Sequence, residues 1–123
     1  MADGLHLLPR YADQIKAIIR RQLPGVEVWA YGSRVDGPCY DGSDVDLALR
    51  APGHAKIPYH RLRGLRYALR DSTIPIIVDL KDWATMPESY QHEIEDRYIV
   101  LVPGNDSVSR AAPATAVDSD QKR

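Results

Sequence analysis

Two short stretches carry residue types whose spacing could support phosphate chemistry. Gly32-Ser33 follows the apolar run 26–31, and a glycine permits close backbone approach while a serine hydroxyl and the next amides can contact a phosphate. Asp44 and Asp46 are separated by one residue, so on a strand their side chains point to the same face, about 6 to 7 Å apart along the chain. A Gly-Ser pair also occurs in turns that bind nothing, and paired aspartates also occur at solvated strand edges.

The paired aspartates need a positive charge close by. Two like charges roughly 4 Å apart cost about 4 kcal/mol at an effective dielectric constant of about 20, and a divalent cation offsets that repulsion most directly. Oxygen ligands favour magnesium, manganese or calcium over zinc. A calcium-binding helix-loop-helix site is disfavoured, because the stretch 44–49 lacks the alternating ligands and the glycine at the sixth position.

Asp79 is a candidate for a third carboxylate at the same point. It lies near the end of the β-branched run 74–80, a predicted buried strand that could pair beside the strand 45–49. Three carboxylates around two metal ions are the arrangement for in-line phosphoryl or nucleotidyl transfer. Asp82 is a rival for this role, and an aspartate at a strand end can also serve as a cap. We favour Asp79 because it lies within the β-branched run.

The combined spacing resembles a known family. Gly32-Ser33, then ten residues, then Asp44-Val45-Asp46, and Asp79 on a later strand are similar to the minimal nucleotidyltransferases of the DNA polymerase β superfamily, whose signature is GS-x10-DxD with a third acidic residue. The resemblance covers roughly residues 8–102. It implies an α+β fold with a small mixed sheet flanked by helices, two Mg²⁺ ions, and a nucleoside triphosphate that is usually ATP.

The resemblance also implies a role for each matching residue. Gly32 and Ser33 would hold the triphosphate, and the catalytic aspartates Asp44, Asp46 and Asp79 would bind metal. Asp79 would in addition help to deprotonate the acceptor hydroxyl. Arg34 follows the Gly-Ser pair as in many family members, so contact with a phosphate is expected for it, with a surface salt bridge as the alternative.

The predicted strands that carry these residues span 26–31, 45–49 and 74–80, and a turn-forming segment, 36–43, separates the first two. Helical periodicity predicts a first helix within 7–23, a second over 59–70 and a third over about 87–98. The predicted inner faces are, in chain order, Leu8, Tyr11, Ile15, Ile18, Ile19 and Leu23; Tyr59, Leu62, Leu65 and Leu69; and Met86, Tyr90, Ile94 and Tyr98. Residues 99–102 are expected to form a helix end or a short strand.

Length and composition fit one small domain. We expect the 123 residues to comprise a nucleotidyltransferase domain, 1–102, and a disordered tail, 103–123, rich in Ser, Ala, Asp, Pro and Thr. The net charge of −1 lacks the positive field of a nucleic-acid binder, so no direct nucleic-acid binding is expected. One cysteine, Cys39, excludes an internal disulfide framework, and no stretch resembles a signal peptide or membrane span. These features predict a soluble, cytoplasmic protein.

The resemblance implies a protein partner as well. Minimal nucleotidyltransferases are commonly encoded beside a HEPN-domain ribonuclease toxin, which implies an antitoxin that transfers AMP from ATP to a toxin tyrosine and forms a hetero-oligomer with the toxin. The basic face of the helix 59–70 could dock an acidic partner, or could simply be solvated. Two alternatives stay open: a binding-only antitoxin that blocks the toxin sterically, and a nucleotidyltransferase subunit that modifies a small molecule or RNA with a helical partner subunit.

Overall fold

A mixed four-stranded sheet forms the centre of the protein, in the order β3-β2-β1-β4. The structure is a computed structural model that describes residues 5–37 and 43–104. Its strands are β1 (Glu27–Tyr31), β2 (Val45–Arg50), β3 (Val78–Asp82) and β4 (Ile99–Val102). β1 pairs antiparallel with β2 and β4, whereas β2 and β3 run parallel. This is the α+β architecture that the resemblance implies.

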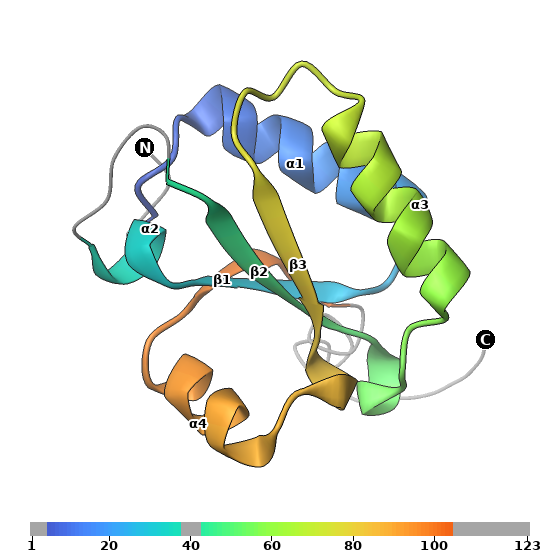
Figure 1. Cartoon of the computed structure of the whole chain (residues 1–123), viewed down its shortest axis with the longest axis vertical. Helices are drawn as coiled ribbons and strands as arrows, with labels where there is room; N and C mark the ends of the chain where they lie inside the picture. Colours follow the sequence, from blue (N-terminus) through green and yellow to red (C-terminus); the bar gives the residue numbers. More distant parts are fainter. Residues whose placement is uncertain (1–4, 38–42, 105–123) are drawn as a thin grey trace, which may run out of the picture.

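The two faces of the sheet are covered differently. Helices α1 (Pro9–Gln22) and α3 (Tyr59–Arg70) lie on one face (Figure 1) and bury the main apolar core, which includes Val28 and Leu47. The other face carries a smaller aromatic cluster under α4 (Glu88–Asp96). Because strand side chains alternate between faces, Asp46 and Arg50 of β2 and Asp79 and Lys81 of β3 point to this second face, whereas Asp82 of β3 lies on the same face as Leu80.

The helices follow the predicted apolar periodicity with local exceptions. In α1 the buried residues are Ala12, Ile15, Ile18 and Ile19, whereas Leu8 precedes the helix and is 44% exposed. In α3, Leu65 and Leu69 are buried, but Tyr59 is 69% exposed because it begins the helix beyond the sheet edge. Both exposed residues were predicted to face inward, and those predictions are wrong. No helix within the described ranges is long and apolar enough to cross a bilayer.

The third predicted strand and the third predicted helix are displaced. β3 begins at Val78 rather than Ile74 and continues to Asp82, since Pro75 cannot donate to a ladder and pairing with β2 starts where the Val45 amide donates to the Ile77 carbonyl. α4 ends at Asp96, and Tyr98 stacks on Trp29 with 3.8 Å between ring centroids. Residues 99–102 form β4, the second of the two structures expected for them.

Three predicted features fall partly or wholly outside the described residues. These are the turn-forming segment 36–43, of which 38–42 are not described, Cys39, and the tail 103–123, of which only Pro103 and Gly104 are described.

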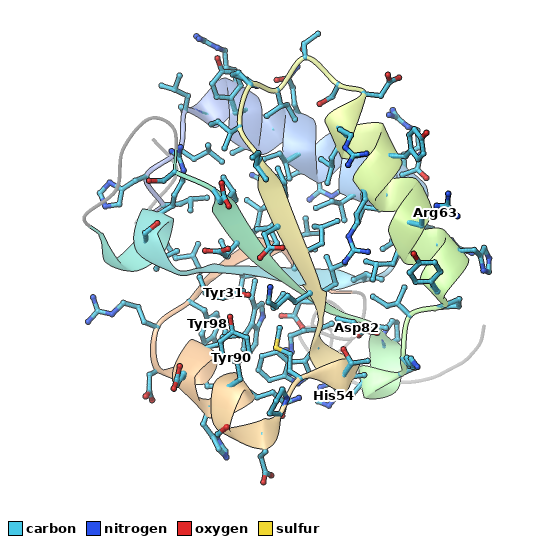
Figure 2. The ribbon with its side chains drawn as sticks, in the orientation of Figure 1. Tyr31, His54, Arg63, Asp82, Tyr90 and Tyr98 are labelled. Carbon is cyan, nitrogen blue, oxygen red and sulfur yellow. The ribbon has the colours of Figure 1, made fainter. Side chains whose placement is uncertain are left out.

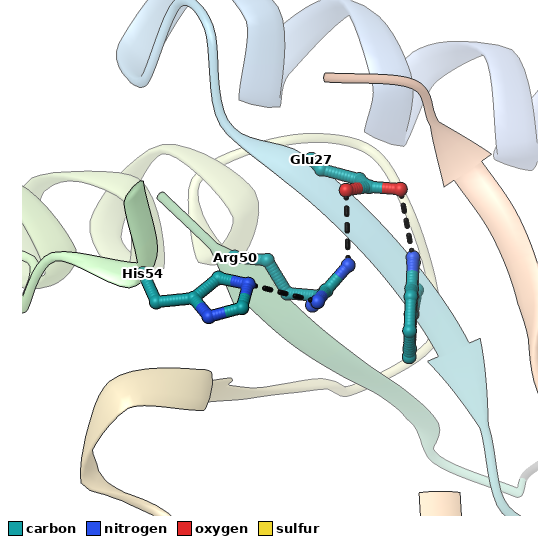
Figure 3. A network of polar contacts seen from close by, with 4 residues as sticks. Glu27, Arg50 and His54 are labelled. Atoms are coloured by element: carbon teal, nitrogen blue, oxygen red, sulfur yellow. Dashed lines mark hydrogen bonds and ion pairs between the residues drawn. The ribbon is translucent and has the colours of Figure 1, made fainter. Parts of the chain in front are cut away.

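A polar and aromatic network joins β1 to β2 on the second face of the sheet. Figure 3 shows the Arg50 guanidinium donating to Glu27 Oε1 at 3.0 Å and contacting His54 at 3.0 Å. Glu27 Oε2 accepts a hydrogen bond from Trp29 Nε1 at 2.9 Å. The guanidinium carbon also lies 3.9 Å from the Trp29 ring centroid and 4.8 Å from that of Trp83. This network holds the end of the sheet that is remote from the aspartates.

Arg50→Ala is expected to lower the free energy of unfolding by about 2 to 3 kcal/mol, because it removes a cation–π contact and leaves the Glu27 carboxylate, whose side chain is 18% exposed, without its cationic partner. Urea unfolding followed by tryptophan fluorescence measures the change. Arg20→Ala, a truncation of an exposed arginine on α1, is the control and should change stability by less than about 0.5 kcal/mol. Equal losses in the two variants would contradict a structural role for the network.

Candidate active site

Three strands place a row of polar side chains across the second face of the sheet. Asp46 pairs with Asp79 in the parallel register of β2 and β3, and with Tyr31 in the antiparallel register of β1 and β2. Residues paired in this way point to the same face. The sequence could not show this register, and it is the register that brings Asp46 and Asp79 together although 33 positions separate them in the chain.

The charge of the row is only partly balanced. Burial raises the pKa of Asp46, and the negative charges of Asp79 and Asp44 raise it further, while Lys81 opposes the shift. Lys81 Nζ lies 2.8 Å from Asp79 Oδ2, and the hydrogen bond to Asp79 is the main cause of a raised pKa for Lys81. One ammonium therefore faces two carboxylates, and a further cation at Asp46 would be favourable.

Gly32 brings the backbone against Asp46. It adopts φ +83° and ψ −157°, a conformation that is essentially restricted to glycine. A Cβ built at this position would overlap Asp46 Oδ2. The glycine thus has two independent reasons to be present, the backbone conformation and the close approach to a carboxylate.

Ser33 begins the short helix α2 (Ser33–Asp36) directly after Gly32. A pocket of about 430 Å³ opens beside this turn. Its lining includes Gly32, Ser33, Asp46 and Tyr90. This space lies against both the turn that would hold a triphosphate and the carboxylate that would bind metal.

Arg34 is buried rather than at the surface, and its contact with a phosphate stays a prediction. Its side chain is buried, with 5% of the residue exposed, so the surface salt bridge is wrong. Nε and one terminal nitrogen donate to the Ser43 carbonyl at 3.0 and 2.9 Å, and the other terminal nitrogen donates to the His6 carbonyl at 2.7 Å. Arg34 is absent from the described lining of the pocket beside Ser33. The guanidinium instead ties α2 to the residue before Asp44, which is a positioning role.

Asp44 lies outside the strand pairing that joins Asp46 to Asp79. It is exposed and precedes the first residue of β2, so strand pairing does not fix it. Across residues 5–37 and 43–104, no three Asp, Glu, His or Cys side chains gather closely enough to hold a metal ion. The oxygen donors, the unbalanced charge and the glycine beside Asp46 nevertheless suit Mg²⁺. The three-aspartate metal site therefore stays a prediction.

Tyr31, Tyr90 and Lys81 belong to the site although the sequence motifs do not include them. Figure 2 shows Tyr31 on the sheet close to Tyr90 of α4, and their hydroxyl oxygens are 3.4 Å apart. Burial, the Tyr90 hydroxyl and the charges of Asp46 and Asp79 together raise the pKa of Tyr31 far above its ordinary value. The Tyr31 hydroxyl consequently stays protonated and can donate a hydrogen bond. The signal for Lys81 was its position two residues after Asp79 on the same strand.

Asp82, the rival of Asp79, has a structural role. It is buried, and its carboxylate accepts hydrogen bonds from the Ile57 amide at 2.9 Å and the Ala84 amide at 3.1 Å. The second bond caps the 3₁₀ turn Trp83–Thr85. Both carboxylate oxygens are thereby used by the backbone, which leaves Asp79 as the aspartate of β3 that pairs with Asp46.

Asp82→Ala is expected to lower the free energy of unfolding by about 2 to 4 kcal/mol, because two backbone amides lose their acceptor. The catalytic rate per folded molecule should stay within about tenfold of that of the wild type. Asp79→Asn should instead keep the stability of the wild type and lose catalytic activity. Urea unfolding and a rate measurement on both variants provide the comparison. Asp71→Ala, an exposed aspartate after α3, is the control for stability. If the Asp82→Ala protein is stable but inactive, Asp82 rather than Asp79 is the candidate for the third metal-binding carboxylate.

Comparisons with known proteins place this geometry in context. Residues 12–102 match the nucleotidyltransferase domain family. The chain is 36% identical over 87 residues to the probable protein adenylyltransferase MntA of Haemophilus influenzae, covering 71% of this chain and 75% of that protein.

Solved structures share the fold. A toxin–antitoxin crystal structure with AMP-PNP matches with a TM-score of 0.64 and 19% identity, over 82% of this chain and 84% of that chain. A tri-AMPylated Shewanella oneidensis HEPN toxin in complex with MNT antitoxin matches with a TM-score of 0.63 and 18% identity, over 86% and 81% of the two chains.

Proposed function

The chain belongs to the nucleotidyltransferase domain family, and we propose that it is an antitoxin enzyme that neutralises a HEPN ribonuclease toxin by transferring AMP from ATP to a toxin tyrosine. The observation that carries the proposal is the pairing of Asp46 with Asp79 beside the Gly32-Ser33 turn. The nature of the acceptor is supported by the relatives, one named a probable protein adenylyltransferase and another a complex that contains an AMPylated HEPN toxin. A hetero-oligomer with the toxin is part of the proposal.

ATP would bind in the pocket beside α2, with its triphosphate against Gly32 and Ser33. Two Mg²⁺ ions, held by Asp44, Asp46 and Asp79, would offset the triphosphate charge and favour ionisation of the acceptor hydroxyl. Arg34 would keep Asp44 close to the turn through its bonds to the Ser43 carbonyl.

The transfer itself needs one proton acceptor and one leaving group. The tyrosine oxygen forms a bond to the α-phosphorus of ATP, the bond from that phosphorus to the bridging oxygen breaks, and pyrophosphate leaves. The Asp79 carboxylate accepts the proton of the tyrosine hydroxyl, and Lys81 balances the charge at Asp79. Because the reaction consumes ATP, a cytoplasmic location is part of the proposal.

The test uses the full chain, a HEPN toxin encoded beside its gene as the proposal requires, Mg²⁺ and ATP labelled at the α-phosphate. Label on a toxin tyrosine, identified by mass spectrometry, and loss of ribonuclease activity are the expected results. The variant Asp44→Ala with Asp46→Ala should give neither.

Two other outcomes would each replace the proposal. If the double variant neutralises the toxin without transferring label, the protein acts by binding alone. If label appears on RNA or on a small molecule when a helical partner subunit is present, the enzyme is a nucleotidyltransferase with a different acceptor.

A further inference from the structure

A groove outside the active site runs between α3 and the outer edge of the sheet. Its volume is about 750 Å³, and its walls are the arginine-bearing side of α3 and the segment 74–78 that leads into β3. Three large apolar residues at or beside it are unusually exposed: Ile77 at 70%, Tyr59 at 69% and Tyr67 at 63%. Exposed apolar side chains gathered in one groove are typical of a binding surface.

The groove is strongly basic. Arg63, Arg66 and Arg70 line it, and Figure 2 shows Arg63 on α3. The helix Tyr59–Arg70 contains no Asp or Glu, and within the described part of the chain these three arginines form no salt bridge. The net charge of the whole chain is −1, so this positive charge is local and complementary to an acidic ligand.

The groove also has an open strand edge. β3 is the outermost strand and pairs, among the described residues, with β2 alone. Beside the groove, the backbone of Val78 faces outward and can meet an extended segment of another protein. Farther along the edge, the Leu80 carbonyl already accepts a hydrogen bond from Arg66 at 3.4 Å and the Asp82 carbonyl accepts one from Thr85 at 3.0 Å. Exposed apolar side chains beside a strand edge suit a polypeptide ligand. They suit a nucleic acid less well, because its phosphates need only the positive charge.

The groove continues toward the proposed catalytic residues. A second pocket, of about 530 Å³, shares Tyr59 and Arg66 with the groove and reaches Asp79 and Lys81. The nucleotide pocket contains Asp46 but lies on the α2 side. The carboxylate pair thus separates two pockets, one suited to ATP and the other open toward the basic groove.

We propose that an acidic, extended segment of the acceptor protein binds in the groove between α3 and β3 and presents its hydroxyl to Asp79 through the adjoining pocket. This inference rests on the proposed function, since it assigns the route of the acceptor in the same reaction. The arginines bind the acidic side chains, the start of β3 at Val78 meets the backbone of the segment, and Tyr67 and Ile77 contact its apolar side chains.

The test measures binding of a short fluorescein-labelled peptide, whose tyrosine is flanked by glutamates and aspartates, by fluorescence anisotropy. A counterpart peptide carries lysines in place of the acidic residues. Wild-type protein should bind the acidic peptide at least about tenfold more tightly, with the difference falling as salt is added. The variant Arg63→Glu, Arg66→Glu, Arg70→Glu should lose that preference, and the corresponding glutamine variant should lie between the two.

A matched control separates the groove from general charge. Arg10→Glu, Arg20→Glu, Arg21→Glu changes three exposed arginines of α1 and alters the net charge equally, but should keep the preference for the acidic peptide. Equal loss in both triple variants, or no preference in the wild type, overturns the inference. Tighter binding of a labelled oligouridine than of the acidic peptide, lost only in the groove variant, would overturn it in favour of RNA.

Binding of AMP-PNP, measured by calorimetry on the same proteins, distinguishes failure of this inference from failure of the proposed function. The groove variant should bind AMP-PNP as the wild type does. If the proteins bind AMP-PNP but the wild type shows no preference for the acidic peptide, only the inference about the groove is overturned. If no protein binds AMP-PNP, the proposed function is contradicted, whatever the result with the peptides.

Discussion

Asp46→Asn is expected to reduce AMP transfer about a thousandfold and to leave the protein folded. The substitution keeps the shape of the side chain but removes the charge at the centre of the row Tyr31–Asp46–Asp79, and loss of one electrostatic partner of a transition state costs about this much. The rate of label transfer from ATP at saturating Mg²⁺ is the measurement. A rate within about tenfold of the wild type would contradict a metal site centred on Asp46.

The same variant should be at least as stable as the wild type when metal is absent. Burial and the nearby charge of Asp79 raise the pKa of Asp46 above 3.8, so the folded protein binds more protons than the unfolded chain between the two pKa values. Stability of the wild type should therefore decrease as pH rises through that window, and this contribution should disappear in Asp46→Asn. Urea unfolding in the presence of a chelator, at pH values on both sides of the window, tests the sign.

Asp13→Asn is the control for both measurements. Asp13 is on α1, its side chain is 75% exposed, and its contact with Lys16 is long at 3.8 Å, so the variant should change neither transfer nor stability by a measurable amount. Asp46→Asn could instead destabilise the metal-free protein more than Asp13→Asn does. That result would mean that the Asp46 carboxylate has a stabilising partner in the protein, and it would contradict an unbalanced negative charge that favours metal binding.

The residues that could be predicted are those whose chemistry is local. The step from Gly32 to Ser33 requires a particular backbone conformation, which a dipeptide can encode, and the close backbone approach expected at Gly32 is present against Asp46. The α+β fold could likewise be anticipated, because the spacing of Gly32-Ser33 and the aspartates resembles that of a family with this fold. The choice of Asp79 rather than Asp82 depended on its place in the β-branched run and stays a prediction, which the backbone bonds of Asp82 favour.

The residues that could not be predicted depend on contacts between distant segments. Arg34 is buried because carbonyl groups of His6 and Ser43 converge on it, and nothing near it in the sequence signals those partners. Tyr98 leaves the predicted helix because Trp29, on another strand, offers a stacking surface. Tertiary contacts outweighed local periodicity in both cases.

Gly32→Ala is expected to lower the free energy of unfolding by about 3 kcal/mol and to abolish detectable AMP-PNP binding. The alanine must adopt a conformation that costs about 1 to 3 kcal/mol for any residue with a Cβ, and its methyl group would displace Asp46 Oδ2. Urea unfolding by tryptophan fluorescence and calorimetric titration with AMP-PNP measure the two effects.

Gly53→Ala is the matched control, because Gly53 also has a positive φ, +67°, but no atom lies within 4 Å of the Cβ that would be added. It should cost about 1 kcal/mol and leave AMP-PNP binding intact. Adding Asp46→Ala to Gly32→Ala then isolates the overlap, since the double variant should be less destabilised than the sum of the single changes. Additive losses, or AMP-PNP binding that survives Gly32→Ala, would mean that the backbone at Gly32 and the carboxylate of Asp46 do not form one site. The close approach of these two residues is what joins a triphosphate-binding turn to a metal-binding strand, so this pair of measurements tests the premise on which the proposed reaction depends.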